Sequence, residues 1–429
     1  METLLLKSVR IFDRTGPHHG NVCDILIRNG RIENIADQIP TQNNMVIWES
    51  PNGAISSGWI DGQVDFKDPG EEQKEGIQNG LNAALHGGIA HVVLNTSNEP
   101  AADHKSAIGY LLDQGATSVC QVHPLGCISA GTKGGQLAEL YDLAEAGAVG
   151  FSDDCPIDRT EMLRRALEYA TELNLPIITC PLDLGLNAGA VMHEGIVSTQ
   201  MGVTGNPTSS EVMRIQRDLE VLRYTGGRLH FSVVSSAEGV QLIRQAKSEG
   251  LQVTCGTTAH HLYFTDEDLS GFDGTLRVMP PFRSEKARKA LCEGVLDGTI
   301  DMLVSDHRPE DLEHADVEFA LAAEGMSGIE SLFAVALSAL SQHATPEIAR
   351  DSIIRSLTEG PRNVFGWESL PMDIGSPADL TWFTADAEWV CSEVSKGHNQ
   401  ANYASLLNKP PLRGNPLGVV TSTGHFSRF

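Results

Sequence analysis

The middle of the chain, between about residues 58 and 306, alternates short apolar runs with segments of helical spacing. The apolar runs include GIAHVVLNT (88–96), PIITCPL (176–182), RLHFSVVS (228–235) and IDMLVSD (300–306). Such runs are typical of parallel strands buried on both faces, and each is followed by an amphipathic helix pattern. About eight of these units predict an α/β fold, a (β/α)8 TIM barrel with its helices outside.

The two ends of the chain have a different texture. Residues 1–55 contain short alternating strands with Asn29-Gly30 as a hairpin turn, and residues 369–429 repeat that pattern. Two strand-rich ends around one long middle predict a small β-sandwich domain assembled from both termini. We therefore expect the sandwich to comprise 1–55 and 369–429, and the barrel to comprise 56–368.

The chain of 429 residues carries a formal charge of −25. Nucleic acids and anionic membranes would repel such a surface, so neither is an expected partner. The eight cysteines form no CxxC pair, which is typical of reduced thiols. The first residues, METLLLKSVRIFD, are expected to form a strand rather than a signal peptide, and no apolar run reaches the ~18 residues of a membrane span. We expect a soluble, cytoplasmic protein.

In a barrel of this class the functional site lies at the carboxyl ends of the strands. Gln63 and Asp65 end the first predicted strand, and their i, i+2 spacing puts both on one face. Asp154, Cys180 and Asp306 each follow a later apolar run. A polar pair at a barrel mouth indicates metal chemistry, although a water-activating enzyme is expected to have histidines there.

Several phrases, in order along nearly the whole chain, resemble the dihydroorotase branch of the amidohydrolase superfamily. They include GWIDGQVDFKDPG, AEAGAVGFSDD, MHEGIVSTQMGVTGNP, TTAHHLYFTDEDL and LVSDHRPED. The resemblance implies the same barrel and a place in pyrimidine biosynthesis. It also implies a subgroup in which an aspartate, rather than a carbamylated lysine, helps to hold the catalytic metals.

The resemblance further implies where the family's metal ligands fall in this chain. Asp154 corresponds to the bridging aspartate, and Asp306 to the aspartate that binds metal and accepts the proton of the attacking water. The other positions are histidines in the family, and none is a histidine here. The full set of vestigial ligand positions is Gln63, Asp65, Asp154, Cys180, Val233 and Asp306.

A catalytic zinc needs about three protein ligands and an open position, and imidazole is a favoured ligand. The loss of every imidazole donor, one of them to Val233, which has no donor atom, is expected to abolish zinc binding. Without the metal the pKa of the attacking water is not lowered toward ~7, so Asp306 keeps only a vestigial general-base position. We expect no cofactor.

The substrate positions that the resemblance implies are also altered. Lys67 replaces an arginine that binds the substrate carboxylate, and lysine lacks the bidentate fork of arginine. Thr96 and Met279 replace asparagines, and Glu310 replaces a histidine where an anionic substrate would lie. We therefore expect the substrate site to be lost together with the metal site.

The carboxylates Asp65, Asp154 and Asp306 leave two alternatives open. They could hold a hard divalent cation such as Mg²⁺ or Mn²⁺, because such ions prefer oxygen ligands. Alternatively, Arg308 or Lys67 compensates their charge. We favour the second interpretation, because Arg308 replaces a small residue of the family at a place where a cation is missing.

We therefore expect a dihydroorotase-like protein without catalytic activity. The resemblance alone implies its partner, the catalytic chain of aspartate transcarbamoylase, with which it would form a hetero-oligomer as an assembly subunit. The first alternative is an active cyclic-amide hydrolase that uses an altered metal site at Asp65, Asp154 and Asp306. The second alternative is a small-molecule binding protein that uses the vacant pocket as a sensor.

Overall fold

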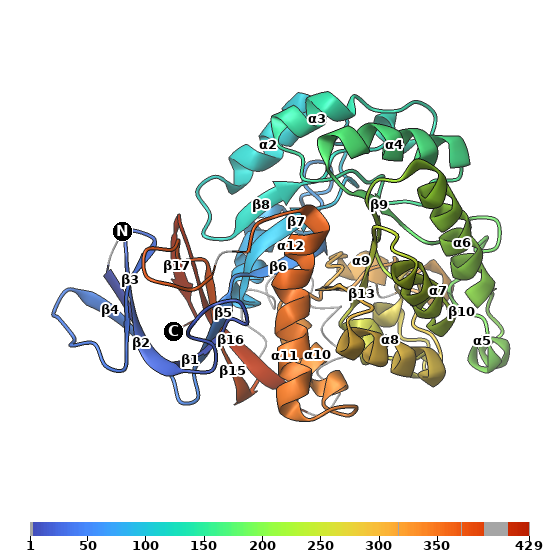
Figure 1. Cartoon of the computed structure of the whole chain (residues 1–429). Helices are drawn as coiled ribbons and strands as arrows, with labels where there is room; N and C mark the ends of the chain where they lie inside the picture. The colour runs from blue at the N-terminus through green and yellow to red at the C-terminus, as the bar shows by residue number, and fades with distance from the viewer. Residues whose placement is uncertain (1–2, 316, 370, 390–410, 429) are drawn as a thin grey trace.

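The computed structural model describes residues 3–315, 317–369, 371–389 and 411–428. Figure 1 shows a strand-rich part built from both ends of the chain beside a barrel ringed by helices. Residues 390–410, within the expected C-terminal part of the sandwich, lie outside the described residues. In the described part of the chain, no helix is both long enough and apolar enough to cross a bilayer.

The predicted barrel is confirmed, and its strands run parallel in two ladders. The ladders contain β6 (Trp59–Val64), β7 (Ile89–Leu94) and β8 (Gln121–Pro124), then β9 (Ile177–Thr179), β12 (Leu229–Phe231), β13 (Val253–Thr258) and β14 (Met302–Val304). The expected fourth strand is reduced to Phe151, which bridges Gly126 on one side and Ile177 on the other. A bridge between Val64 and His307 closes the ring.

Helices cover the outside of the barrel because each has one apolar face. In α4, the residues Met162, Leu163, Ala166, Leu167 and Ala170 are buried, which is the i, i+3, i+4 spacing of a helix packed on a sheet. The helices are α1 (Ile77–His86), α2 (Lys105–Gly115), α3 (Leu140–Ala146), α4 (Thr160–Leu173), α5 (Ile196–Met201), α6 (Thr208–Thr225), α7 (Ala237–Ser248), α8 (Glu285–Asp297), α9 (Leu312–Ala315), α10 (Leu332–Leu340), α11 (Pro346–Leu357) and α12 (Glu359–Phe365). Smaller pieces are β10 (Met192–His193), β11 (Gly205–Asn206) and 3-10 turns at Ala130–Thr132, His260–Leu262, Asp266–Leu269, Gly274–Leu276 and Phe319–Leu321.

The strands of the two termini form one eight-stranded sheet. Asn29 and Gly30 have φ of 53° and 71°, so the hairpin turn is confirmed. Trp48 stacks on Trp382 with ring centroids 5.3 Å apart, and the sheet thereby encloses its own core. The strands are β1 (Thr3–Phe12), β2 (Val22–Arg28), β3 (Arg31–Ala36), β4 (Met45–Glu49), β5 (Ala54–Ser57), β15 (Leu380–Glu388), β16 (Arg413–Thr421) and β17 (Gly424–Ser427).

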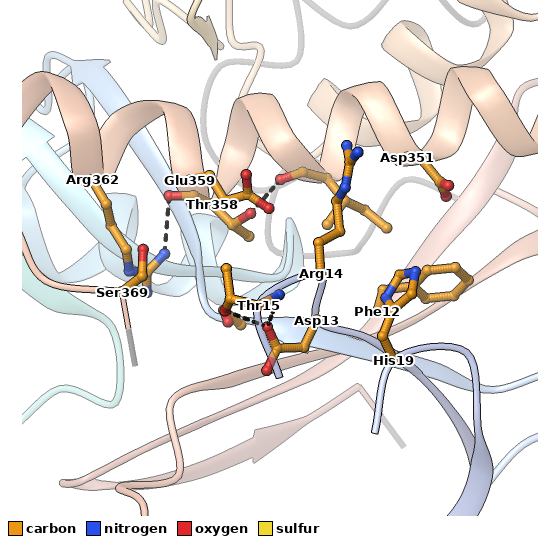
Figure 2. Close-up of a pocket in the computed structure, with 12 residues that line it drawn as sticks. Phe12, Asp13, Arg14, Thr15, His19, Asp351, Thr358, Glu359, Arg362 and Ser369 are labelled. Atoms are coloured by element: carbon orange, nitrogen blue, oxygen red, sulfur yellow. Dashed lines mark hydrogen bonds between the residues drawn. The ribbon is translucent and has the colours of Figure 1, made fainter. Parts of the chain in front are cut away.

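The sheet meets the barrel at the amino ends of the barrel strands. The backbone amide of Trp59, the first residue of β6, donates to the Thr381 hydroxyl, which in turn donates to the Gly88 carbonyl just before β7. Figure 2 shows a pocket at this junction, lined by Phe12 and Asp13 at the end of β1, by Thr358 between α11 and α12, and by Arg362 of α12. Because β6 begins at the sheet, its carboxyl end lies at the opposite, open end of the barrel.

Candidate functional site

The open end of the barrel, here called the mouth, carries the polar residues singled out in the sequence. Gln63 lies in β6 and Asp65 directly after it, while Cys180 directly follows β9. Asp306 lies two residues after β14, and its side chain contacts Gln63 across the closure of the ring, with 2.7 Å between the Gln63 Nε2 donor and Asp306 Oδ1. The topology therefore brings residues 243 positions apart in sequence to one place.

Arg308 joins two of the carboxylates. Its two terminal nitrogens donate to the two oxygens of Asp154 at 2.7 and 2.6 Å, and its Nε donates to Asp306 Oδ1 at 2.9 Å. The Arg308 side chain is 21% exposed, and those of Asp154 and Asp306 are 8% and 11% exposed. Burial alone would lower the pKa of Arg308, but the two carboxylates outweigh it and raise that pKa well above its ordinary value. The expected charge compensation by Arg308 is therefore present.

Asp306 is fully engaged at one oxygen. Its Oδ1 accepts a hydrogen bond from the Gln63 amide and a second, charge-assisted one from Arg308. The Gln63 side chain directs its NH₂ group at this carboxylate as a hydrogen-bond donor, whereas a metal ligand must offer a lone pair. The vestigial base position thus holds a carboxylate that protein donors neutralise.

Asp65 has its own cation. Lys67 Nζ lies 2.9 Å from Asp65 Oδ2, and Ser97 donates to the same oxygen at 2.7 Å. Burial would raise the pKa of Asp65, but Lys67 and Arg308 outweigh it and hold that pKa below its ordinary value. Sequence reasoning missed Ser97, although it follows directly on the Thr96 position in the same strand-end phrase.

Glu310 lies between two lysines. Lys74 Nζ is 2.9 Å from Glu310 Oε2, and Lys67 Nζ is 3.8 Å from Oε1. Lys74 was not expected here, because it lies in the loop before α1 and follows no apolar run. The mouth thus contains four carboxylates, Asp65, Asp154, Asp306 and Glu310, and three cations, Lys67, Lys74 and Arg308.

The remaining expected site positions lie in apolar or structural surroundings. Burial, together with the charge of Asp154, raises the pKa of the Cys180 thiol to about 12, so the thiol stays protonated at neutral pH. Val233 is buried among apolar side chains of the barrel interior. Thr96 is buried and donates its hydroxyl to the Ser152 carbonyl at 3.0 Å, and Met279 is half-buried.

Histidines near the mouth have structural partners or apolar surroundings. His261 is bonded through Nδ1 to the Thr258 hydroxyl at 2.8 Å, and through Nε2 to the Pro280 carbonyl at 3.0 Å. His307 is buried and packs edge-on against Phe66, with ring centroids 5.9 Å apart. Among the described residues, neither ring forms a hydrogen bond with a carboxylate of the mouth.

The backbone of the mouth is unusual at three of the named positions. Lys67, Asp154 and Asp306 have φ of 59°, 52° and 46°, a left-handed conformation that costs an ordinary side chain roughly 1 kcal/mol each. Residues persist in such conformations only where the surrounding structure imposes them. The loops of the mouth therefore have a geometry that the surrounding structure imposes.

The residues of the mouth do not fit a zinc centre. Every carboxylate at a ligand position has a cationic side chain at 2.6 to 2.9 Å, and the remaining ligand positions offer an amide donor, a protonated thiol and a valine. Within the described ranges, no group of three or more His, Cys, Asp or Glu side chains has the arrangement of a metal site. A divalent ion would have to displace the guanidinium of Arg308.

Comparisons with known proteins agree with the sequence resemblance. Residues 54–239 match the family model described as dihydro-orotase-like. The chain is 35% identical to a dihydroorotase of Anaeromyxobacter dehalogenans, with 93% of each chain covered, and 36% identical to one of Pelotomaculum thermopropionicum, covering 96% of this chain and 95% of the other. Among solved structures, an L-hydantoinase (dihydropyrimidinase) from Arthrobacter aurescens has the same fold, with a TM-score of 0.82 at 19% identity over 100% of this chain and 96% of that one.

Proposed function

The chain belongs to the dihydroorotase-like family of the amidohydrolase superfamily, and from this premise we propose that it is a non-catalytic subunit of pyrimidine biosynthesis. It keeps the barrel of the family and serves as an assembly subunit for aspartate transcarbamoylase. That role belongs in the cytoplasm, in agreement with cysteines that form no CxxC pair.

The loss of catalysis is supported by one observation above all, the position of Arg308. Hydrolysis with a metal-activated water needs a metal to lower the pKa of that water and a free carboxylate to take its proton. Arg308 holds Asp154 through both oxygens and shares Asp306 Oδ1 with Gln63. This arrangement supports the proposed loss of catalysis, because the guanidinium holds two of the carboxylates that a metal would need and occupies one oxygen of the carboxylate that would take the proton.

The proposed partner rests on the family resemblance. The catalytic chain of aspartate transcarbamoylase is the enzyme of the preceding step, and a subunit without a reaction of its own needs a structural task to account for its intact fold. The strained loops at Lys67, Asp154 and Asp306 and the closed barrel support such a task, because they show a fold that holds an imposed geometry.

A direct test compares the chain with a relative in the same assay. Purified protein is assayed for dihydroorotate hydrolysis with Zn²⁺, Mn²⁺ and Mg²⁺ supplied, and its metal content is measured by elemental analysis. The dihydroorotase of Anaeromyxobacter dehalogenans is the positive control. We expect no turnover above buffer; turnover together with about one metal per chain would favour the alternative, a cyclic-amide hydrolase with a hard cation at Asp65, Asp154 and Asp306.

A second experiment tests the assembly role separately. The chain is mixed with aspartate transcarbamoylase from its own organism and analysed by size-exclusion chromatography with light scattering. We expect a common peak, and higher transcarbamoylase activity in the mixture than in the transcarbamoylase alone. Separate elution with full transcarbamoylase activity in the absence of the chain would remove the assembly role and leave a small-molecule sensor to be tested with pathway intermediates.

A further inference from the structure

The guanidinium of Arg308 lies where two separate parts of the barrel direct their carboxylates. Asp154 follows the bridge residue Phe151 in the fourth strand position, and Asp306 follows β14 in the eighth. Both side chains start from a left-handed backbone that the surrounding structure imposes, and Asp154 belongs to a loop separate from that of Asp306 and Arg308. Two anions from separate loops thus converge on one cation.

The geometry of the contact is that of a bound guanidinium ion. Three nitrogens are used, two on Asp154 as a fork and one on Asp306, at 2.6 to 2.9 Å. The positive charge of Arg308 also acts on Asp65: the charges of Lys67 and Arg308 together lower the pKa of that carboxylate. The backbone of Arg308 is held independently, because its amide donates to the Met326 carbonyl at 2.9 Å.

We propose that the mouth of this barrel is a guanidinium site whose ligand is supplied by the chain itself, as the side chain of Arg308. The proposal rests on the proposed loss of metal chemistry and deepens it. Asp154 and Asp306 bind the guanidinium, and Gln63 donates a further hydrogen bond to Asp306. Removal of the Arg308 side chain leaves these groups in place, so the site takes a free guanidinium ion from solution.

The test measures melting temperature in the wild type and in Arg308→Ala, with guanidinium or ethylguanidinium chloride titrated in the low millimolar range. Sodium chloride at equal ionic strength is the salt control. Arg283→Ala is the matched variant, because Arg283 is a buried arginine whose nearest carboxylate, on Glu211, lies 3.8 Å away and whose other partners are neutral.

We expect Arg308→Ala to melt a few degrees below the wild type, and guanidinium to restore at least half of that loss in a saturable manner. The wild type and Arg283→Ala should show no such rise, and the double variant Arg308→Ala/Asp154→Asn should lose the rescue. An absent rescue in Arg308→Ala, an equal rescue in Arg283→Ala, or a rise with Mn²⁺ but not with guanidinium would overturn the proposal.

A second pair of variants keeps the test decisive if Arg308→Ala does not fold. Arg308→Lys retains a tethered cation, and Arg308→Met retains only the length of the side chain. We expect the lysine variant to melt above the methionine variant, and the wild type to be unaffected by EDTA. Equal melting of the two variants, or a fall of the wild type in EDTA, contradicts the proposal. If guanidinium does not restore the melting temperature of Arg308→Ala and the wild type shows no dihydroorotate turnover, the guanidinium site is refuted but the proposed function is not.

Discussion

The two ends of the barrel hold buried charge in different ways. At the mouth, four carboxylates and three cations compensate one another within a single end of the barrel. At the junction with the terminal sheet, one carboxylate, Asp379, accepts from Arg362 at 2.7 Å and from His91 at 2.9 Å. Asp379 precedes β15, whereas Arg362 lies in α12 and His91 in β7, so this smaller cluster joins the sheet to the barrel.

The difference shows which contacts the family fold needs and which it can exchange. At the mouth, four of the six ligand positions that the resemblance implies carry a different residue, and the charges there are paired mainly with one another. At the junction, the same carboxylate also determines how two parts of the chain pack, so a change there has consequences in both. The predictions below test this contrast, from the largest expected effect to the smallest.

Asp379→Ala should be the most damaging single change. It leaves Arg362 and His91 without their shared anion, and breaking a buried ion pair costs about 4 kcal/mol of unfolding free energy. Urea unfolding followed by circular dichroism measures the loss. Asp373→Ala, which removes an exposed carboxylate 3.7 Å from His18, should change the unfolding free energy by less than about 0.5 kcal/mol. A loss below 1 kcal/mol for Asp379→Ala would contradict the proposed role of the junction.

Arg308→Met should cost somewhat less, about 3 kcal/mol, because Asp306 keeps its hydrogen bond from Gln63 after the change. The triple variant Arg308→Met/Asp154→Asn/Asp306→Asn should be more stable than Arg308→Met alone, since no uncompensated carboxylate remains. The same urea experiment measures both proteins. Additive losses in the triple variant would show that the three side chains do not form one network.

A pH experiment tests one histidine of the junction, His123, against the mouth, where burial lowers the pKa of His260 to about 3 and that of His261 to about 4. Burial, together with the neighbouring His91, lowers the pKa of His123 at the junction to about 3, so the folded state keeps this ring neutral while the unfolded chain protonates it below about 6.5. Stability is therefore lost as pH falls from 6.5 toward 3. The lowered pKa of Asp65 at the mouth acts only below pH ~4, where stability is lost as that carboxylate is protonated.

His123→Gln should consequently reduce the stability lost between pH 7 and pH 5 by about 2 kcal/mol. Glutamine stays neutral over this range and can still bond to His91, whose Nδ1 lies 3.1 Å from His123 Nε2. Lys67→Ala, a change at the mouth, should leave the difference between pH 7 and pH 5 unaltered. Thermal unfolding at the two pH values measures both variants, and the opposite ranking would place the acid sensitivity at the mouth.

The smallest expected effect is that of restoring two histidines. Gln63→His/Asp65→His should produce no dihydroorotase turnover with zinc, because Cys180, Val233 and Arg308 still prevent a metal site from forming. The measurement is the dihydroorotate assay with and without Zn²⁺. Measurable activity in this double variant would mean that Arg308 yields its place to a metal more readily than the ion pairs suggest.

Much of this architecture follows from local patterns. The apolar runs and helical spacings predict the barrel, and Asn29-Gly30 predicts a hairpin of the terminal sheet. Both predictions succeed because strand burial and turn geometry depend on residues that are neighbours in sequence. The fourth strand position is reduced to one bridging residue, Phe151, since the pairing there depends on its neighbours in space. The site was predicted as a set of positions, together with the role of Arg308 as a counter-ion. The contacts of Ser97 and Lys74 could not be predicted, because each joins residues from separate loops.

Arg308 also has a consequence for how the protein matures. A metal-dependent relative is finished only after synthesis, when an ion has been acquired from a limited cellular supply. Here the central cation is the side chain of Arg308, so it is incorporated during translation, one per molecule. If Arg308 takes the place of a metal, we expect the chain to fold equally well in the presence and absence of zinc.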